Sequence, residues 1–141
     1  MLVRLIYASR SVAPITSELV RQILDAAHQH NPERGITGVL CYGDGVFVQA
    51  LEGGRAEVNA LYQTICRDSR HSDVTLLSYE EVDQREFACW SMAQAPLDKK
   101  NAALLLRHSS SPVLDPFRLS GKTTCRLLSE LGSSGGLRSK S

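Results

Sequence analysis

The sequence predicts an α+β fold of the ferredoxin-like type, a βαββαββ sandwich in which two helices cover one face of a sheet. Two observations lead to this prediction. Short runs rich in β-branched and aromatic residues are typical of strands, and two longer runs with apolar residues at helical spacing lie between them. The resulting order contains two split βαβ units, which is the pattern of a ferredoxin-like sheet.

The first predicted strand spans Leu2–Ala8, and a helix follows it. Thr16 or Ser17 can cap this helix, because a side-chain oxygen there accepts a free N–H of the first turn. Steps of three and four residues place several side chains on one face of the helix. These positions are Leu19, Ile23, Ala26, Ala27 and His30. We expect the helix to end at Asn31-Pro32, because proline disfavours helical geometry in the residue before it.

A hairpin is expected after the first helix. Gly35–Tyr42 and Val46–Leu51 are both rich in apolar and β-branched residues, which favours strands. The Gly43-Asp44-Gly45 sequence between them tolerates positive φ angles, as a tight hairpin turn requires. The two strands are therefore expected to be joined by this turn.

The second predicted helix runs from about Arg55 to Asp68. Its apolar face is formed at helical spacing by Val58, Leu61, Tyr62 and Ile65. Val74–Val82 is expected to be a strand. Another strand is expected within Phe87–Pro96, where it carries Trp90 and Met92.

Beyond Pro96 the composition changes. Asn101–His108 and Gly121–Leu131 are expected to be helical, with a loop over Ser109–Pro116 between them. The remaining Gly/Ser-rich segment is expected to be disordered. The chain is thus divided into a sandwich domain at residues 1–96, a helical extension at 97–131 and a tail at 132–141.

Composition excludes several classes of function. The formal net charge is +1, so no strong field favours nucleic acid or an anionic membrane. The four cysteines lack the spacing of a metal site, and we expect no bound metal. The amino terminus resembles a strand rather than a leader, and no apolar run is long enough to span a membrane. A cytoplasmic protein is expected.

Polar residues within apolar runs are the candidates for function. Tyr7 lies at the end of the first strand, and Gln49 interrupts the apolar run Phe47–Leu51. A buried amide without a partner costs about 1–3 kcal/mol, so Gln49 must find one. A purely structural Tyr7–Gln49 hydrogen bond would satisfy this need equally well, so these two residues alone do not give a function.

Several segments taken together resemble the BLUF family, the sensors of blue light using FAD. The resemblance runs from about Leu2 to Ala95. The matching segments are Leu5–Ser9, Asn31–Leu40, Phe47–Gly53, Asp68–His71 and Phe87–Met92. The two predicted carboxy-terminal helices are also similar, though less closely, to those of short stand-alone members of the PixD type.

The resemblance implies a flavin held between the two helices. The implied binding positions are Tyr7, Ile23, Ala27, His30, Asn31, Phe47, Gln49, Ile65, Asp68, Arg70 and His71. Asn31 would read the pyrimidine edge, and Arg70 would lie at the C2 carbonyl side. His71 would lie nearer the ribityl or phosphate part. FAD is the expected flavin, although FMN or riboflavin would also suit a slot that reads mainly the ring.

The resemblance also implies a mechanism. Tyr7 would donate an electron to the excited flavin, and Gln49 would then change its hydrogen bonds by rotation or tautomerisation. Trp90 or Met92 would relay this change to the carboxy-terminal helices. Output would pass to a protein partner or through a change of homo-oligomeric assembly, with no enzymatic activity in this chain.

Two other classes of function stay open on the residues alone. A light-independent regulatory domain could use the same slot for another small molecule. A small hydrolase of acylphosphatase-like fold would need a phosphate-cradling loop after the first strand. Arg10 lies near the required place, but Ala8–Val12 is not glycine-rich, which argues against this class.

Overall fold

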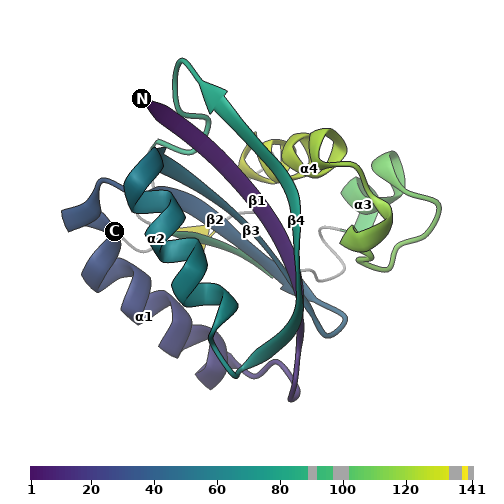
Figure 1. Ribbon diagram of the computed structural model, residues 1–141. Helices are drawn as coiled ribbons and strands as arrows, with labels where there is room; N and C mark the ends of the chain where they lie inside the picture. Colours follow the sequence, from purple (N-terminus) through teal and green to yellow (C-terminus); the bar gives the residue numbers. More distant parts are fainter. Residues whose placement is uncertain (89–91, 97–101, 134–137, 140–141) are drawn as a thin grey trace.

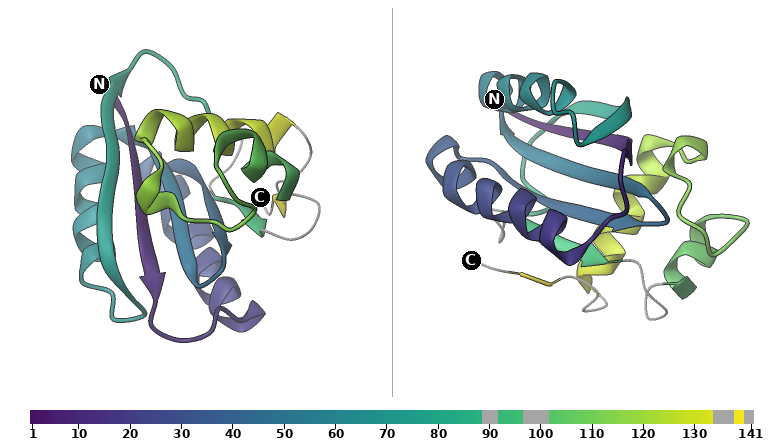
Figure 2. Two further views of the ribbon diagram at one scale, coloured as in Figure 1. Left: turned by 90° about the vertical axis from the view of Figure 1, so that its right-hand side faces the viewer. Right: turned by 90° about the horizontal axis from the view of Figure 1, so that it is seen from below.

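One six-stranded sheet organises the molecule, with the strand order β4-β1-β3-β2-β5-β6. The computed structural model describes residues 1–88, 92–96, 102–133 and 138–139. In order, the elements are β1 (Leu2–Ser11), α1 (Ser17–Arg34), β2 (Thr37–Gly43), β3 (Val46–Gly54), α2 (Arg55–Cys66), β4 (His71–Val82), β5 (Ala93–Pro96), α3 (Ala102–His108), the 3₁₀ helix η1 (Pro116–Arg118), α4 (Gly121–Ser133) and β6 (Arg138–Ser139). Helices α1 and α2 lie on one face of the sheet, and α4 lies on the other (Figures 1 and 2). The expected ferredoxin-like α+β fold is confirmed.

Strand β1 is an interior strand of the sheet and pairs antiparallel with both β3 and β4. The register sets Tyr7 of β1 opposite Gln49 of β3. Strands β2 and β3 form the expected hairpin, and Asp44 and Gly45 at its turn have φ angles of 52° and 77°. Positive φ at two successive residues matches the twist of the paired strands.

Alternation along β1 builds two separate hydrophobic cores. Val3, Leu5 and Tyr7 belong to the core beneath α1 and α2. Ile6 and Ala8 belong to the core on the opposite face. Successive residues of a strand point to opposite faces, so one strand supplies both cores.

Helix α1 does not end at Asn31-Pro32, as expected from the sequence, but continues to Arg34. Its end is set by Gly35, which has a φ of 67°. The N–H of Ile36 donates to the Asn31 carbonyl, and the N–H of Gly35 donates to the Pro32 carbonyl, which together form a Schellman motif. This motif closes the helix at the glycine and keeps Asn31 within its last turn.

The observed strand boundaries differ from the expected ones mainly around Met92. Strand β5 spans only Ala93–Pro96, so Met92 precedes the strand rather than lying in it, and Trp90 is outside the described residues. The backbone N–H groups of Glu86 and Phe87 donate to the carboxylate of Glu52 instead of to a neighbouring strand. Glu86 and Phe87 therefore belong to the connection between β4 and β5 and not to a strand.

The carboxy-terminal extension closes the second face of the sheet. Its buried leucines are Leu105, Leu114, Leu127, Leu128 and Leu131. Helix α4 continues to Ser133, and Arg138–Ser139 pair antiparallel with β5, so these parts of the expected disordered tail have regular structure. The division into sandwich domain, extension and tail stays a prediction. Within the described residues, no helix combines the length and apolarity needed to cross a membrane.

Candidate functional site

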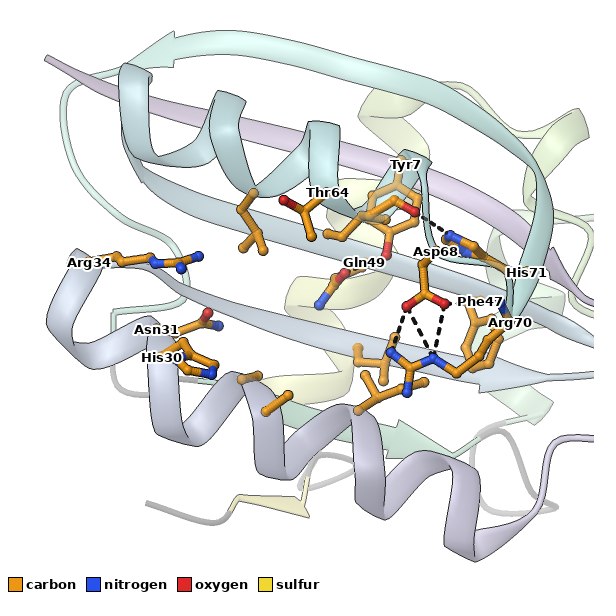
Figure 3. A pocket seen from close by; sticks show the side chains of 16 residues that line it. Tyr7, His30, Asn31, Arg34, Phe47, Gln49, Thr64, Asp68, Arg70 and His71 are labelled. Atoms are coloured by element: carbon orange, nitrogen blue, oxygen red, sulfur yellow. Dashed lines mark hydrogen bonds and ion pairs between the residues drawn. The ribbon is translucent and has the colours of Figure 1, made fainter.

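A cavity of about 370 Å³ lies between α1, α2 and the sheet. Its volume is within the range of small-molecule sites. All the positions that the resemblance assigned to flavin line it. The lining residues are Tyr7, Ile23, Ala26, Ala27, His30, Asn31, Arg34, Leu40, Phe47, Gln49, Leu61, Thr64, Ile65, Asp68, Arg70 and His71. Figure 3 shows the α1 residues Asn31 and Arg34 at one end of the cavity and Arg70 at the other.

Tyr7 and Gln49 form the buried polar centre of the cavity wall. The phenolic O–H of Tyr7 donates to Oε1 of Gln49 at 2.5 Å, across the β1–β3 register pair. Tyr7 and Gln49 are only 4% and 6% exposed, respectively. Burial raises the pKa of Tyr7 far above its usual range, so the phenol is neutral and acts as a donor. The position of Tyr7 opposite Gln49 and the neutral state of its phenol therefore both favour this hydrogen bond.

Gln49 has a second partner on the opposite side of its amide. Its Nε2 group donates to Sδ of Met92 at 3.4 Å. Met92 is fully buried and belongs to the core beneath α1 and α2. One amide thus connects the phenol of Tyr7 with the residue that precedes β5.

Helix α1 supplies the apolar and polar residues of one wall. Ile23, Ala27 and Asn31 recur at steps of four residues, so the same helix face meets the cavity. Asn31 is 2% exposed, although its residue type is usually found at the surface. A buried amide facing a cavity is suited to read the polar edge of a planar ligand.

Asp68 and Arg70 form an ion pair at the opposite end. Nη2 of Arg70 lies 2.6 Å from Oδ2 of Asp68, and the backbone N–H of Arg70 donates to Oδ1 at 2.9 Å. The Arg70 hydrogen bonds hold the pKa of the Asp68 carboxyl below its usual value. Asp68 lies beyond the end of α2, in the connection to β4, whereas the sequence predicted it within the helix.

His71 is fixed by two hydrogen bonds. Its Nε2 lies 2.6 Å from the Ile65 carbonyl, and its Nδ1 lies 2.7 Å from Oγ of Ser9. A carbonyl can only accept, so Nε2 carries a proton. The ring packs edge-on against Tyr7 with a centroid distance of 6.4 Å. His71 therefore links the Ile65 carbonyl of α2 to the Ser9 side chain of β1, next to the ring of Tyr7.

Arg10, considered above for phosphate binding, is used elsewhere. Its guanidinium lies 4.3 Å from the centroid of the Phe117 ring and forms an ion pair with Asp73. It docks the extension onto β1 and does not line the cavity.

The comparison with known families decides what kind of site this is. The family described as "Sensors of blue-light using FAD" matches residues 2–93, which is more than half of the chain. The chain belongs to the BLUF family. This result confirms the expectation of a blue-light sensor that binds FAD, the flavin named in the description of the family.

Solved BLUF structures have the same fold over nearly the whole chain. The photo-activated state of BlsA has a TM-score of 0.84 and 32% identity, covering 93% of this chain and 94% of that one. The dark state of BlrB, a BLUF protein, has a TM-score of 0.79 and 30% identity, covering 95% and 96% of the two chains. The likeness therefore includes the region beyond residue 93.

Curated relatives are much longer proteins. Photoactivated adenylate cyclase subunit alpha of Euglena gracilis is 32% identical over 114 residues, which cover 81% of this chain and 11% of the cyclase. The blue light- and temperature-regulated antirepressor BluF of Escherichia coli K12 is 30% identical over 87 residues, covering 62% of this chain and 22% of the antirepressor. What these BLUF relatives do as whole proteins is not carried over by the match.

Sequence reasoning missed several residues of the BLUF cavity. They are Ala26, Arg34, Leu40, Leu61 and Thr64. Helical spacing had placed Ala26 and Leu61 on the apolar helix faces, but neither was assigned to the cavity. The same spacing could have found Arg34, which is four residues after His30. Leu40 could have been found from the hairpin, because it pairs with Gln49.

Proposed function

We propose that this chain detects blue light by changing the hydrogen bonds of Gln49 when bound FAD is excited. The observation that carries the proposal is the chain of contacts from Tyr7 through Gln49 to Met92, at the wall of a cavity suited to a planar ligand. A structural tyrosine–glutamine pair would not need a cavity on one side and a weak thioether acceptor on the other.

The residues of the cavity fit a flavin ring. Apolar side chains such as Ile23 and Ile65 come from facing helices, and they suit the two faces of a flat ring. At one end of the cavity, Asn31 offers both a hydrogen-bond donor and an acceptor. At the other end, Arg70 offers a positive charge. FAD, when bound, supplies the absorption of blue light and a strong one-electron oxidant in its excited state.

Tyr7 is the proposed electron donor. A buried neutral phenol that has lost an electron becomes strongly acidic, so its proton leaves along the existing hydrogen bond toward Oε1 of Gln49. When the electron and proton return, the amide is left rotated or tautomerised. Only an amide side chain offers a donor and an acceptor that can exchange places in this way.

Met92 is the proposed relay because its sulfur can only accept. In a rotated amide, Oε1 would face Sδ of Met92, and two acceptors cannot form a hydrogen bond. The Gln49–Met92 contact is then lost, so the side chain of Met92, in the segment before β5, is released. Trp90 is the other proposed relay residue, and it lies two positions earlier in the same segment.

Output is proposed to reach a protein partner or to change a homo-oligomeric assembly. The connection before β5 reaches α4, because Oγ of Ser129 donates to Oε1 of Glu86 at 2.6 Å. Phe87 in the same connection packs in the core with Leu127 and Leu128 of α4. A shift of this connection would therefore be transmitted to the extension. Light changes the output only if the partner binds the two states unequally.

The proposal is tested by the absorption spectrum of the FAD-loaded protein before and after blue light. We expect a small red shift that reverses in the dark. Gln49→Leu should bind FAD but lose the shift, because leucine has neither donor nor acceptor. A protein that stays colourless with FAD would instead support a sensor of another small molecule, and a Gln49→Leu protein with a normal shift would remove Gln49 from the mechanism.

A further inference from the structure

Met92 is held at its main chain as well as at its side chain. Nε2 of His28 lies 2.8 Å from the Met92 carbonyl oxygen. The side chain of the same residue accepts from Gln49. These two contacts come from different elements, α1 and β3, and meet at one residue.

The His28 contact is the stronger of the two on chemical grounds. A carbonyl can only accept, so Nε2 of His28 carries the proton and donates it. An N–H to carbonyl bond of this length is a normal hydrogen bond, whereas thioether sulfur is a weak acceptor. The main-chain bond to His28 therefore contributes more than the Gln49 contact to the position of Met92.

Helix α1 presents His28 to the sheet and not to the cavity. Leu24, His28 and Asn31 follow one another at helical spacing, and the first and last of them are buried. His28 does not line the cavity, but Asn31 on the next turn does. The same helix therefore connects the cavity with the segment before β5.

The sheet leaves room for Met92 at a glycine. A Cβ on Gly38 would lie 3.2 Å from Cε of Met92 and 2.0 Å from the Ala50 carbonyl oxygen. Only a glycine allows both the close β2–β3 pairing and the methionine methyl group at this place. Gly38, Gln49 and His28 thus form a socket for Met92, which we call the methionine socket.

We propose that His28 is a positioning residue that holds the Met92 main chain in the methionine socket and thereby sets how long the light-induced state lasts. This inference rests on the proposed function, because it assigns a role in the same switch. Rotation of Gln49 releases only the side chain of Met92. The His28 bond decides how readily the segment leaves and how readily it returns.

The test compares three variants of the FAD-loaded full chain. His28→Phe keeps a ring of similar size but removes the donor. His28→Gln restores the donor, because the glutamine amide nitrogen reaches about as far along the side chain as Nε2 of histidine. Gln29→Phe, at the exposed neighbouring position on α1, is the matched control for adding an aromatic ring to this helix.

Two measurements are made on each variant. The first is the rate at which the red shift decays in the dark. The second is acrylamide quenching of Trp90 fluorescence in the dark, since Trp90 is the only tryptophan and lies two residues before Met92. In His28→Phe, decay should slow about fivefold, which corresponds to the roughly 1 kcal/mol of one hydrogen bond, and quenching should increase. The amplitude of the shift should stay the same.

His28→Gln and Gln29→Phe should both behave like the unaltered chain. The inference is overturned if decay in His28→Phe is unchanged or faster, or if His28→Gln behaves like His28→Phe. If the unaltered chain shows no red shift, the proposed function fails instead. The dark quenching measurement still decides then whether His28 holds the segment.

Discussion

The two faces of the sheet are built from the same strands but are filled differently. On the α4 face, leucines of the extension and Phe87 pack against Ile6 and Ala8 and form a closed core. On the α1 and α2 face, Tyr7 and Gln49 border a cavity of about 370 Å³. Protein interiors are close-packed, so a cavity of this size in an otherwise packed domain indicates a ligand site.

The difference arises from the helices and not from the strands. Helix α4 places long side chains such as Leu127 and Leu128 toward the sheet. Helix α1 places the small side chains of Ala26 and Ala27 along the cavity. The α4 face, which we call the packed face, is therefore filled. The α1 and α2 face, which we call the hollow face, keeps a cavity beside its own core that can carry a cofactor and the polar pair that responds to it.

The largest effect is expected on the hollow face. Tyr7→Phe should bind FAD but lose the light-induced red shift, because phenylalanine has no proton to give after electron loss. Tyr62→Phe is the control, since the Tyr62 ring lies 5.7 Å from the Tyr7 ring by centroid distance but is not hydrogen-bonded to Gln49. Absorption difference spectra check both variants. A Tyr7→Phe protein with a normal shift would contradict the central role of the phenol.

A large loss of stability without a loss of photochemistry is expected on the packed face. Leu128→Ala should lower the free energy of unfolding by about 2–5 kcal/mol, because it leaves a cavity in a closed core. Urea unfolding measures the loss, and the light-induced red shift should persist below the transition. A shift that disappears in the folded variant would mean that the two faces are not separate in function.

A smaller effect is expected for Met92, which lies in the core beneath α1 and α2 and contacts Gln49. Met92→Ala should keep most of the red shift, because Tyr7 and Gln49 remain. It should weaken the light-dependent change in assembly measured by size-exclusion chromatography, because Gln49 no longer touches the segment before β5. An unaltered light-dependent change in assembly would show that the signal takes another route.

The smallest effect is expected for the Asp68–Arg70 pair. The Arg70 hydrogen bonds lower the pKa of folded Asp68 below its unfolded value of about 3.9, so this pair stabilises the fold above about pH 4. The contribution is lost as the pH falls through the folded pKa, and it should not exceed about 1 kcal/mol because both groups are partly exposed. Stability of Asp68→Asn should therefore fall less steeply between pH 5 and pH 3, as measured by urea unfolding. If stability falls equally steeply with pH in Asp68→Asn and in the unaltered chain, the Asp68–Arg70 ion pair is not formed in solution.

Local patterns in the sequence predicted the fold and the elements that line the cavity, whereas the family resemblance assigned the cavity residues. The β-rich composition of Leu2–Ala8 and the helical spacing around Ile23 and Ile65 are short-range signals, and they correctly predicted the elements that line the cavity. The predicted end of α1 was wrong because Pro32 was given more weight than Gly35 as a helix terminator. Proline is tolerated in the last turn here, whereas the left-handed glycine closes the helix.

Contacts between residues far apart in the sequence could not be derived from local patterns, and the resemblance only suggested that Gln49 is coupled to Trp90 or Met92. His28 and Met92 are 64 residues apart, and Gln49 and Met92 are 43 apart. Neither pair is marked by spacing or composition. The register of β1 and β3 was also needed before Tyr7 and Gln49 could be placed opposite each other. Family resemblance supplied the site residues, and only the folded chain shows which of them touch.

The buried carboxylate of Glu52 limits how the switch can move. It is fully inaccessible to solvent and accepts from Arg4 and from the backbone N–H groups of Glu86 and Phe87. Pulling those two N–H groups away would leave the buried carboxylate with Arg4 as its remaining side-chain partner among the described residues, which is costly. We therefore expect Glu86 and Phe87 to stay anchored at Glu52. A shift begun at Met92 would then reach α4 by a rotation of the connection about this anchor rather than by its detachment.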